Sequence, residues 1–91
     1  MIVQQTPTFS KQKKKLHANQ IQALDNAIRD ILRNPKIGEQ KRGDLNFIRV
    51  YKFKTVNQEC LLAYQITDDS ILLHALGSHE NFYRDIKRSL R

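Results

Sequence analysis

The sequence predicts an α+β domain in which a short strand and a helical hairpin pack on one face of a small sheet. This sheet is expected to be mainly antiparallel and four-stranded, with a short helix after it. Two observations support this fold class: apolar residues recur at helical spacing in the first third of the chain, and at alternating, strand-like spacing from residue 45 onward. A length of 91 residues fits one domain, residues 1–91, with a modest core.

The amino-terminal half is predicted to form the strand and the two helices. Residues 2–6 are β-like, and they end at a proline, which has no amide hydrogen to donate to a sheet. A first helix is predicted from Thr8 to about His17, with Thr8 or Ser10 able to cap it. A second helix ends at residues 34–35, an Asn-Pro pair. Its apolar positions, at helical spacing, are Ile21, Leu24, Ile28, Ile31 and Leu32.

The carboxyl-terminal half is predicted to supply the other three strands. Residues 35–44 indicate a connecting loop, because two glycines and several charges interrupt any periodicity. The strands and turns follow in the order strand 46–54, turn 56–58, strand 59–67, turn 67–70, strand 71–76. A glycine and a serine then lead into the terminal helix.

One face of this sheet is expected to stay open, because both long helices are predicted to cover the other face. Leu61, Ala63 and His74 would then expose apolar area, and exposed apolar patches usually have a partner protein.

The charge of the chain favours an anionic partner. Lysine and arginine number 16 against 9 acids, which gives a formal charge of +7 and a pI near 9.9. Cys60 is the only cysteine, so the chain can form no internal disulfide and no cysteine-based zinc site, and a reducing cytoplasm is expected. No stretch approaches the roughly 18 apolar residues of a membrane span, so we expect no membrane partner.

The positive charge is concentrated in the predicted first helix, and no acid precedes Asp25. These lysines either form a solvated helix face or contact phosphates directly. The loop 35–44 is also basic, through Lys41 and Arg42 among others. The lysines of the first helix are Lys11, Lys13, Lys14 and Lys15.

Alternation in residues 46–54 separates two kinds of side chain. Phe47, Tyr51 and Phe53 are predicted to face one way, with Arg49 interrupting that set. Lys52 and Lys54 face the other way, either as a solvated face or as paired cations for a phosphate.

The terminal helix is predicted to have an anchoring face and a polar face. Phe82, Ile86 and Leu90 share one face, and His79, Tyr83 and Lys87 share the other at four-residue spacing. Tyr83 is either a packing residue or a reactive one, and His79 is either a residue of the helix start or a proton-transfer group. His17 and His74 are predicted to have no functional role.

Short segments along nearly the whole chain point to one family. They are residues 6–9 (TPTF), 14–17 (KKLH), 34–35 (NP), 41–45 (KRGDL), 49–54 (RVYKFK), 62–64 (LAY) and 76–85 (LGSHENFYRD). Together they resemble the RelE/ParE superfamily of bacterial toxins from type II toxin–antitoxin modules, and within it the ParE-like toxin group.

The resemblance implies two possible activities. RelE-like members enter the ribosomal A site and cut the mRNA, whereas ParE-like members inhibit DNA gyrase and cut nothing. Because the fold is common to both, the fold alone does not choose between them. In either case a cognate antitoxin is expected as a partner, with ribosome and mRNA, or alternatively gyrase, as the target.

For cleavage, the resemblance implies a site without metal or cofactor. RNA cutting then requires activation of a 2′-hydroxyl, neutralisation of phosphate charge and a proton for the leaving 5′-oxygen. Lys52 and Lys54 match the family's lysine pair, while His79 and Tyr83 match the region of its proton-transfer groups, so these four are the catalytic candidates. The nucleic-acid-binding candidates are Lys11, Lys13, Lys14, Lys15, Lys41, Arg42, Arg49, Arg84 and Lys87.

One departure separates this sequence from many of the RNA-cutting members. They carry an arginine on the third strand where this chain has Leu61, so a phosphate ligand is lost unless Arg49 or Arg84 replaces it. The leading hypothesis is a metal-independent endoribonuclease that cuts mRNA on the ribosome, an mRNA interferase. The alternatives are a gyrase inhibitor and a weakly toxic member whose main role is the complex with its antitoxin.

Overall fold

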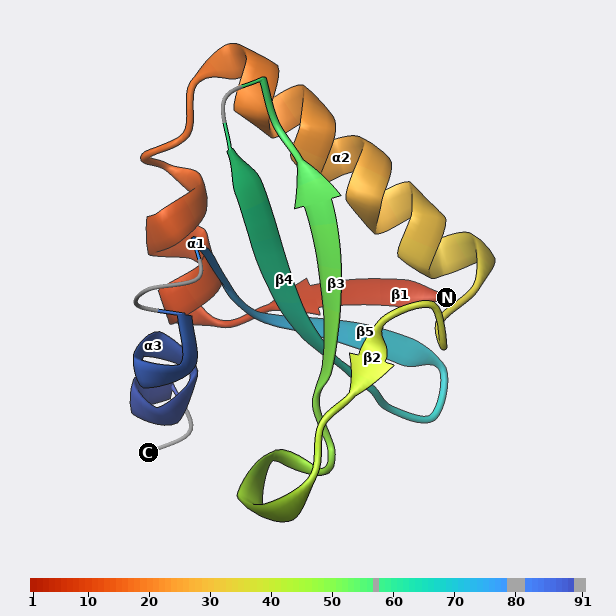
Figure 1. The fold of residues 1–91 in the computed structure, drawn as a ribbon. Coiled ribbons are helices and arrows are strands. Elements are labelled where there is room, and N and C mark those ends of the chain that lie inside the picture. Colours follow the sequence, from red (N-terminus) through yellow and green to blue (C-terminus); the bar gives the residue numbers. More distant parts are fainter. Residues whose placement is uncertain (57, 79–81, 90–91) are drawn as a thin grey trace.

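The computed structural model describes residues 1–56, 58–78 and 82–89 and confirms the α+β class (Figure 1). These residues contain three α-helices, one 3-10 helix and five strands. In chain order they are β1 (Ile2–Gln5), α1 (Pro7–Lys13), α2 (Ala18–Arg33), β2 (Glu39–Gln40), the 3-10 helix η1 (Gly43–Leu45), β3 (Arg49–Lys54), β4 (Glu59–Ile66), β5 (Ser70–Gly77) and α3 (Phe82–Ser89).

The sheet has five strands, in the order β1-β5-β4-β3-β2, so the prediction of four strands was wrong. Strands β2 to β5 pair antiparallel, while β1 runs parallel to β5. The missed strand is β2, which lies inside the segment predicted as a loop. Its two residues pair with Val50 and Arg49 at the edge of the sheet, and two residues are too few to produce a recognisable alternation.

The first helix begins earlier than predicted, because its cap is neither Thr8 nor Ser10. The hydroxyl of Thr6 accepts a hydrogen bond from the Phe9 amide (3.1 Å) and donates one to the carbonyl of His74 (2.6 Å). Pro7 occupies the first turn, where its missing amide hydrogen costs nothing. The same threonine therefore caps α1 and fixes it to β5.

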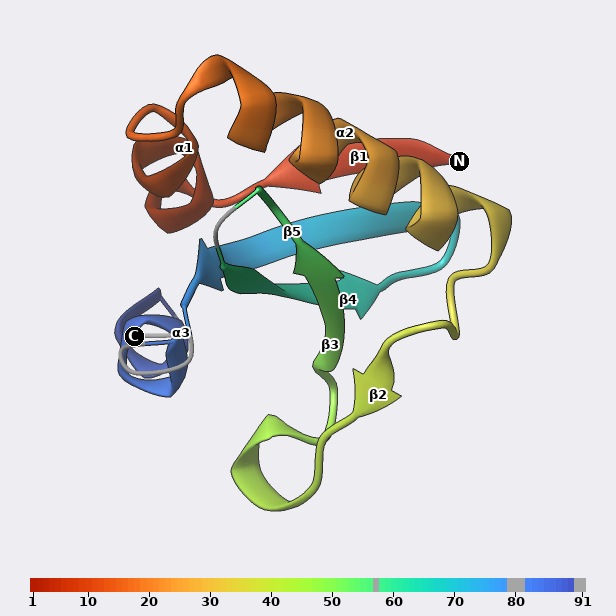
Figure 2. The same ribbon diagram turned by 45° about the horizontal axis from the view of Figure 1, so that its top comes forward.

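The larger apolar core lies between the sheet and the pair α1 and α2. Figure 2 shows these two helices over one side of the sheet, while α3 and the loop that carries η1 lie toward the other side. Phe9 from α1 and Leu24 and Ile31 from α2 are completely buried against the strands. The strand residues of this core are Leu62, Tyr64, Ile71, Leu73 and Leu76.

The opposite face of the sheet is covered, which overturns the prediction of an open apolar face. Leu61 is 2% exposed, Ala63 is 0% exposed and His74 is 5% exposed. Leu61 and Ala63 are covered because Phe82 and Ile86, four residues apart on α3, pack onto this face in a second, smaller apolar cluster. His74 instead contacts the Phe47 ring and the Gln65 side chain. The predicted role of Phe82 and Ile86 as the buried side of the terminal helix is confirmed, while Leu90 lies outside the described residues.

Among the described residues, no helix is both long enough and apolar enough to cross a membrane.

Candidate active site

Strand β3 presents two different faces, as its alternating sequence predicts. Tyr51 and Phe53 are partly buried against the core beneath α1 and α2. Lys52 and Lys54 point to the side covered by α3, and both side chains are exposed. Phe47, predicted to share the side of Tyr51, precedes the strand and contacts the ring of His74 edge to face, with 6.2 Å between the centroids.

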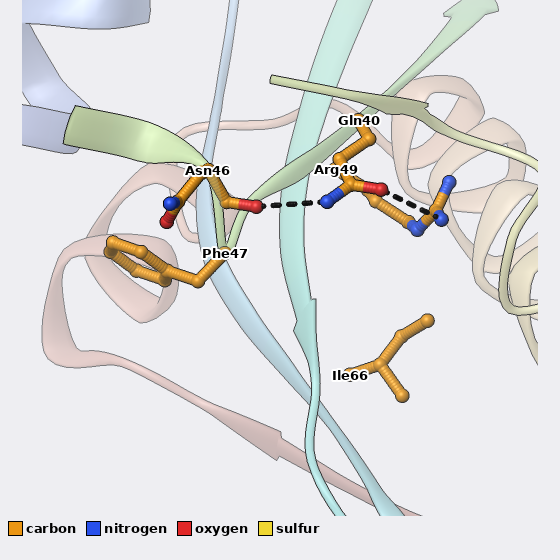
Figure 3. A pocket seen from close by; sticks show the side chains of 5 residues that line it. All are labelled: Gln40, Asn46, Phe47, Arg49 and Ile66. Carbon is orange, nitrogen blue, oxygen red and sulfur yellow. Dashed lines mark hydrogen bonds between the residues drawn. The ribbon is translucent and has the colours of Figure 1, made fainter. Parts of the chain in front are cut away.

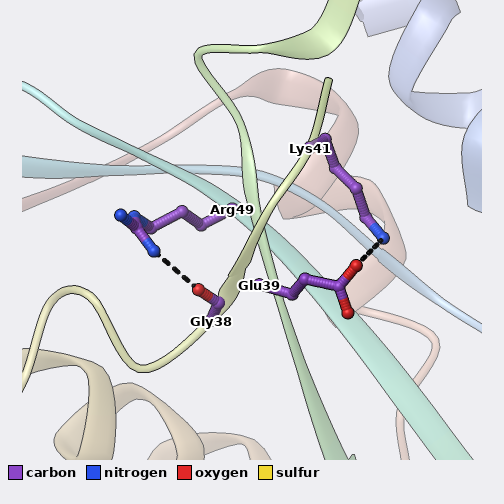
Figure 4. Close-up of polar contacts among 4 residues, drawn as sticks. All are labelled: Gly38, Glu39, Lys41 and Arg49. Atoms are coloured by element: carbon purple, nitrogen blue, oxygen red, sulfur yellow. Dashed lines mark hydrogen bonds and ion pairs between the residues drawn. The ribbon is translucent and has the colours of Figure 1, made fainter.

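On the side covered by α1 and α2, the Arg49 side chain forms hydrogen bonds within the protein. Its guanidinium donates to the carbonyl of Gly38 (2.8 Å) (Figure 4). It also donates to the carbonyl of Lys36 (3.2 Å) and to the side-chain oxygen of Gln40 (3.3 Å). These bonds hold the segment that follows α2 against β3. Because Arg49 faces away from Lys52, it cannot replace the arginine that is missing at position 61.

A hollow of about 230 Å³ lies beside Arg49, lined by the residues drawn in Figure 3. Arg49 and Gln40 bond to each other there, and the amide of Gln40 donates to the backbone carbonyl of Asn46 (3.1 Å). The polar groups on this side thus hold together the β2 edge of the sheet.

Two tyrosines on the same side also form hydrogen bonds within the protein. The hydroxyl of the fully buried Tyr64 donates to the carbonyl of Pro35 (2.6 Å) and accepts from the amide of Gly38 (2.9 Å). The Tyr51 hydroxyl donates to the Asp30 carboxylate on α2 (3.0 Å). Burial raises the pKa of both phenols, and the Asp30 carboxylate raises the pKa of Tyr51 further, so both remain neutral hydrogen-bond donors.

On the other side of the sheet, Tyr83 of α3 meets a lysine that follows β2. The Nζ of Lys41 lies 5.6 Å from the centroid of the Tyr83 ring and 3.4 Å from a carboxylate oxygen of Glu39. The nearby Tyr83 hydroxyl is the main cause that raises the pKa of Lys41, and Glu39 raises it further against the opposing effect of burial. Lys41 therefore stays protonated.

Tyr83 itself is half-buried at the margin of the second apolar cluster. Its ring packs edge to face against Phe82, with 5.3 Å between the centroids and 79° between the planes. Lys52 pairs in register with Leu61, which is buried in the same cluster. The structure therefore places Lys52, Lys54, Tyr83 and Lys41 on one side of the sheet, while His79 lies outside the described residues.

The other predicted nucleic-acid-binding cations are spread over several surfaces. Arg42 is exposed beside Lys41, and both line a hollow of about 470 Å³ with Gly43 and Asn46. Lys15 lines a hollow of about 220 Å³ that reaches the end of β5. The remaining exposed cations are Lys11 and Lys14 near α1 and Arg84 and Lys87 on α3, while Lys13 is half-buried.

Two further groups with possible reactivity, the Cys60 thiol and the His74 imidazole, are buried. Burial raises the pKa of the Cys60 thiol, which keeps it protonated. His74, the extra residue of a β-bulge opposite Ala63 and Tyr64, lies 3.0 Å from Gln65 through Nε2, and burial lowers its pKa. Within the described part of the chain, no group of three His, Cys, Asp or Glu side chains is gathered as metal ligands would be.

The contact between Lys41 and Tyr83 was not predicted from the sequence. The sequence identified Lys41 only as one of several charges in a basic loop, because the edge strand β2 within that segment was not predicted. The spacing of Glu39 and Lys41, two residues apart, was the available signal that both side chains point the same way.

The sequence model of one family matches residues 3–87. That family is described as the ParE-like toxin of type II bacterial toxin–antitoxin systems. The chain belongs to this family. No curated protein matches its sequence significantly.

Solved structures share the fold of this ParE-like toxin. A mutant of the Escherichia coli toxin RelE in the free state superposes with a TM-score of 0.74 at 17% identity, covering 97% of this chain and 90% of that one. The intact E. coli RelBE toxin–antitoxin complex gives 0.68 at 21% identity, with 87% and 96% covered. A conserved hypothetical protein of Helicobacter pylori gives 0.52 at 20% identity, with 87% and 94% covered.

Proposed function

We propose that this toxin inhibits growth by cutting mRNA on the ribosome without a metal ion, at the face of the sheet beside α3. The observation that carries the proposal is the common placement of four groups there. Lys52 and Lys54 are exposed on β3, and the Nζ of Lys41 lies 5.6 Å from the centroid of the Tyr83 ring on α3. Metal-free RNA cleavage requires proton transfer and stabilisation of phosphate charge, and a phenol and cations on one face can supply both.

The proposed reaction is an attack of the RNA's own 2′-oxygen on the adjacent phosphorus. The bond from phosphorus to the 5′-oxygen breaks, which leaves a 2′,3′-cyclic phosphate on one fragment and a 5′-hydroxyl on the other. Lys52 and Lys54 stabilise the negative charge that grows on the phosphate oxygens. The 2′-hydroxyl gives up one proton and the 5′-oxygen takes up another, and we assign these two transfers to Tyr83 and His79, one as the general base and the other as the general acid.

The wider positive surface is proposed to hold the ribosome. Lys11, Lys14, Lys15 and Arg42 are exposed, and contacts of such side chains with RNA phosphates release counterions. Binding should therefore weaken steeply as the salt concentration rises.

We also propose that an antitoxin inactivates this toxin by binding it. The family is defined by toxin–antitoxin systems, and one structure of the same fold is described as a toxin–antitoxin complex. With a formal charge of +7, the chain favours an acidic binding segment in that partner.

Inhibition of DNA gyrase is the second candidate, and one observation favours it. Where many RNA-cutting relatives carry an arginine, Leu61 is buried in the apolar cluster beneath α3. A surface that lacks this phosphate ligand is better suited to binding a protein than to cutting RNA.

The two candidates are separated by one set of measurements. Expression of the toxin should generate new 5′ ends in translated mRNA, and purified toxin should cut mRNA only when ribosomes are present. The supercoiling activity of purified gyrase should be unchanged. Gyrase inhibition together with intact mRNA would replace the first proposal with the second.

A further inference from the structure

The contacts of Lys41 exceed what a lysine that only binds phosphate would need. Its side chain is 22% exposed, although it directly follows the short edge strand β2 and its neighbour Arg42 is exposed. Its Nζ lies 5.6 Å from the centroid of the Tyr83 ring and 3.4 Å from a carboxylate oxygen of Glu39.

We propose that Lys41 is a positioning residue that holds the Tyr83 phenol at the cationic face of the sheet and thereby joins α3 to the edge strand β2. This inference rests on the proposed cleavage of mRNA, in which Tyr83 transfers a proton.

The first argument is that packing alone fixes Tyr83 only in part. Helix α3 has eight residues, which is too short to be stable in isolation, and its buried anchors are Phe82 and Ile86. Tyr83 lies beside these anchors but is only half-buried, so its ring keeps one open side. The ammonium group of Lys41 lies over this ring, and this contact limits the orientations of the phenol.

The second argument is the register of β2. Glu39 pairs with Val50, and the amide of Lys41 donates to the carbonyl of Ile48 (3.0 Å), so the backbone of Lys41 is held against β3. Glu39 and Lys41 therefore both face α3. Edge strand β2 thus gives Lys41 a fixed base from which its side chain reaches Tyr83.

The third argument concerns Glu39, whose side chain is 73% exposed. An exposed ion pair of this kind contributes little stability, so its effect is to direct the ammonium group of Lys41 rather than to hold the fold together. A phosphate that arrives at the face can then compete with Glu39 for Lys41 without displacing Tyr83.

A double-mutant cycle on ribosome-dependent cleavage tests the proposal, with Lys41→Met, Tyr83→Phe and the two combined. We expect Lys41→Met to lower kcat by about tenfold with little change in KM, because the phenol loses its fixed orientation. The combined variant should be no slower than Tyr83→Phe alone, and Lys41→Arg should recover most of the activity.

Arg42→Met is the matched control, because it removes the same charge from the next residue in the loop. It should mainly raise KM, and its effect should add to that of Tyr83→Phe. Independently of cleavage, NMR titration of the Lys41 side chain should show its pKa falling toward the ordinary value in Tyr83→Phe.

Three results bear on the proposal in different ways. Additive effects of Lys41→Met and Tyr83→Phe, or an unchanged Lys41 titration in Tyr83→Phe, would overturn it. A wild-type toxin that cuts no mRNA would overturn the proposed function itself. That result is distinct from an active toxin that is indifferent to Lys41→Met.

Discussion

The two faces of the sheet use their polar residues in opposite ways. On the face covered by α1 and α2, the hydroxyls of Tyr51 and Tyr64 and the guanidinium of Arg49 bond to carbonyls or carboxylates of the protein itself. On the face covered by α3, Lys52 and Lys54 are exposed, although they belong to the same strand as Arg49 and Tyr51. The charge of a strand residue therefore does not indicate that it belongs to a functional site until the face of the sheet on which it lies is known.

The largest expected effect compares the apolar anchors of the two faces. Phe9→Ala should lower the free energy of unfolding by about 3–5 kcal/mol, because it leaves a cavity in the main core. Phe82→Ala should cost less, because α3 is a short terminal helix that can separate while the remaining sheet and helices stay folded. Urea unfolding of both variants measures this, and equal losses would contradict the distinction.

The second-largest expected effect on stability concerns the close contact between Gly38, in the segment that joins α2 to β2, and the ring of Tyr64. A Cβ added at Gly38 would lie 2.8 Å from the ring and hydroxyl oxygen of Tyr64, so Gly38→Ala should cost about 1–3 kcal/mol of stability. Gly77→Ala is the matched control, since nothing lies within 4 Å of its added Cβ. Thermal unfolding should separate the two, and equal stabilities would show that Tyr64 can move aside.

Arg49 and Lys52 allow the comparison to be tested on a single strand. Arg49→Met should lower stability by roughly 1–3 kcal/mol, because the carbonyls of Lys36 and Gly38 lose their donor. Lys52→Met should leave stability unchanged and reduce mRNA cleavage. A stable Arg49→Met variant that binds RNA poorly would instead assign Arg49 to the nucleic-acid surface, as its charge alone predicts.

The smallest expected effect is a dependence of stability on pH from His74. Burial lowers its pKa, so the folded state favours the neutral ring and the unfolded state binds the proton more readily. The stability that depends on neutral His74 is thus complete above the unfolded pKa of about 6.5 and is lost as the pH falls through the lower folded value. Chemical unfolding between neutral and mildly acidic pH should show a smaller slope for His74→Gln, whereas identical slopes would contradict this.

Much of the fold could be predicted because its main elements carry long, regular patterns. The helical spacing of Leu24, Ile28 and Ile31 and the alternation of Tyr51, Lys52 and Phe53 each correspond to a real element with the expected face buried. The family, too, could be recognised, because its short segments are spread over the whole chain.

What the sequence did not reveal depends on pairing between distant segments. Strand β2 exists only because residues 39 and 40 meet Val50 and Arg49, and the burial of Leu61 depends on α3 folding back over β4. The partners of Arg49 and Lys41 follow from these two events. From their charge alone, Arg49 and Lys41 were both predicted to bind nucleic acid, whereas in the structure they lie on different faces of the sheet and make different contacts.

The most direct test of the central claim, that the face beside α3 cuts RNA, compares two double variants of equal charge loss. One is Lys52→Ala with Lys54→Ala on β3, and the other is Arg29→Ala with Arg33→Ala on α2. The side chains of all four residues are exposed. Ribosome-dependent mRNA cleavage is measured for both, with thermal unfolding as a check on the fold. We expect the β3 variant to lose at least about a hundredfold in cleavage while staying folded, and the α2 variant to remain within a few-fold of the wild type. Equal activities in the two variants would contradict the claim.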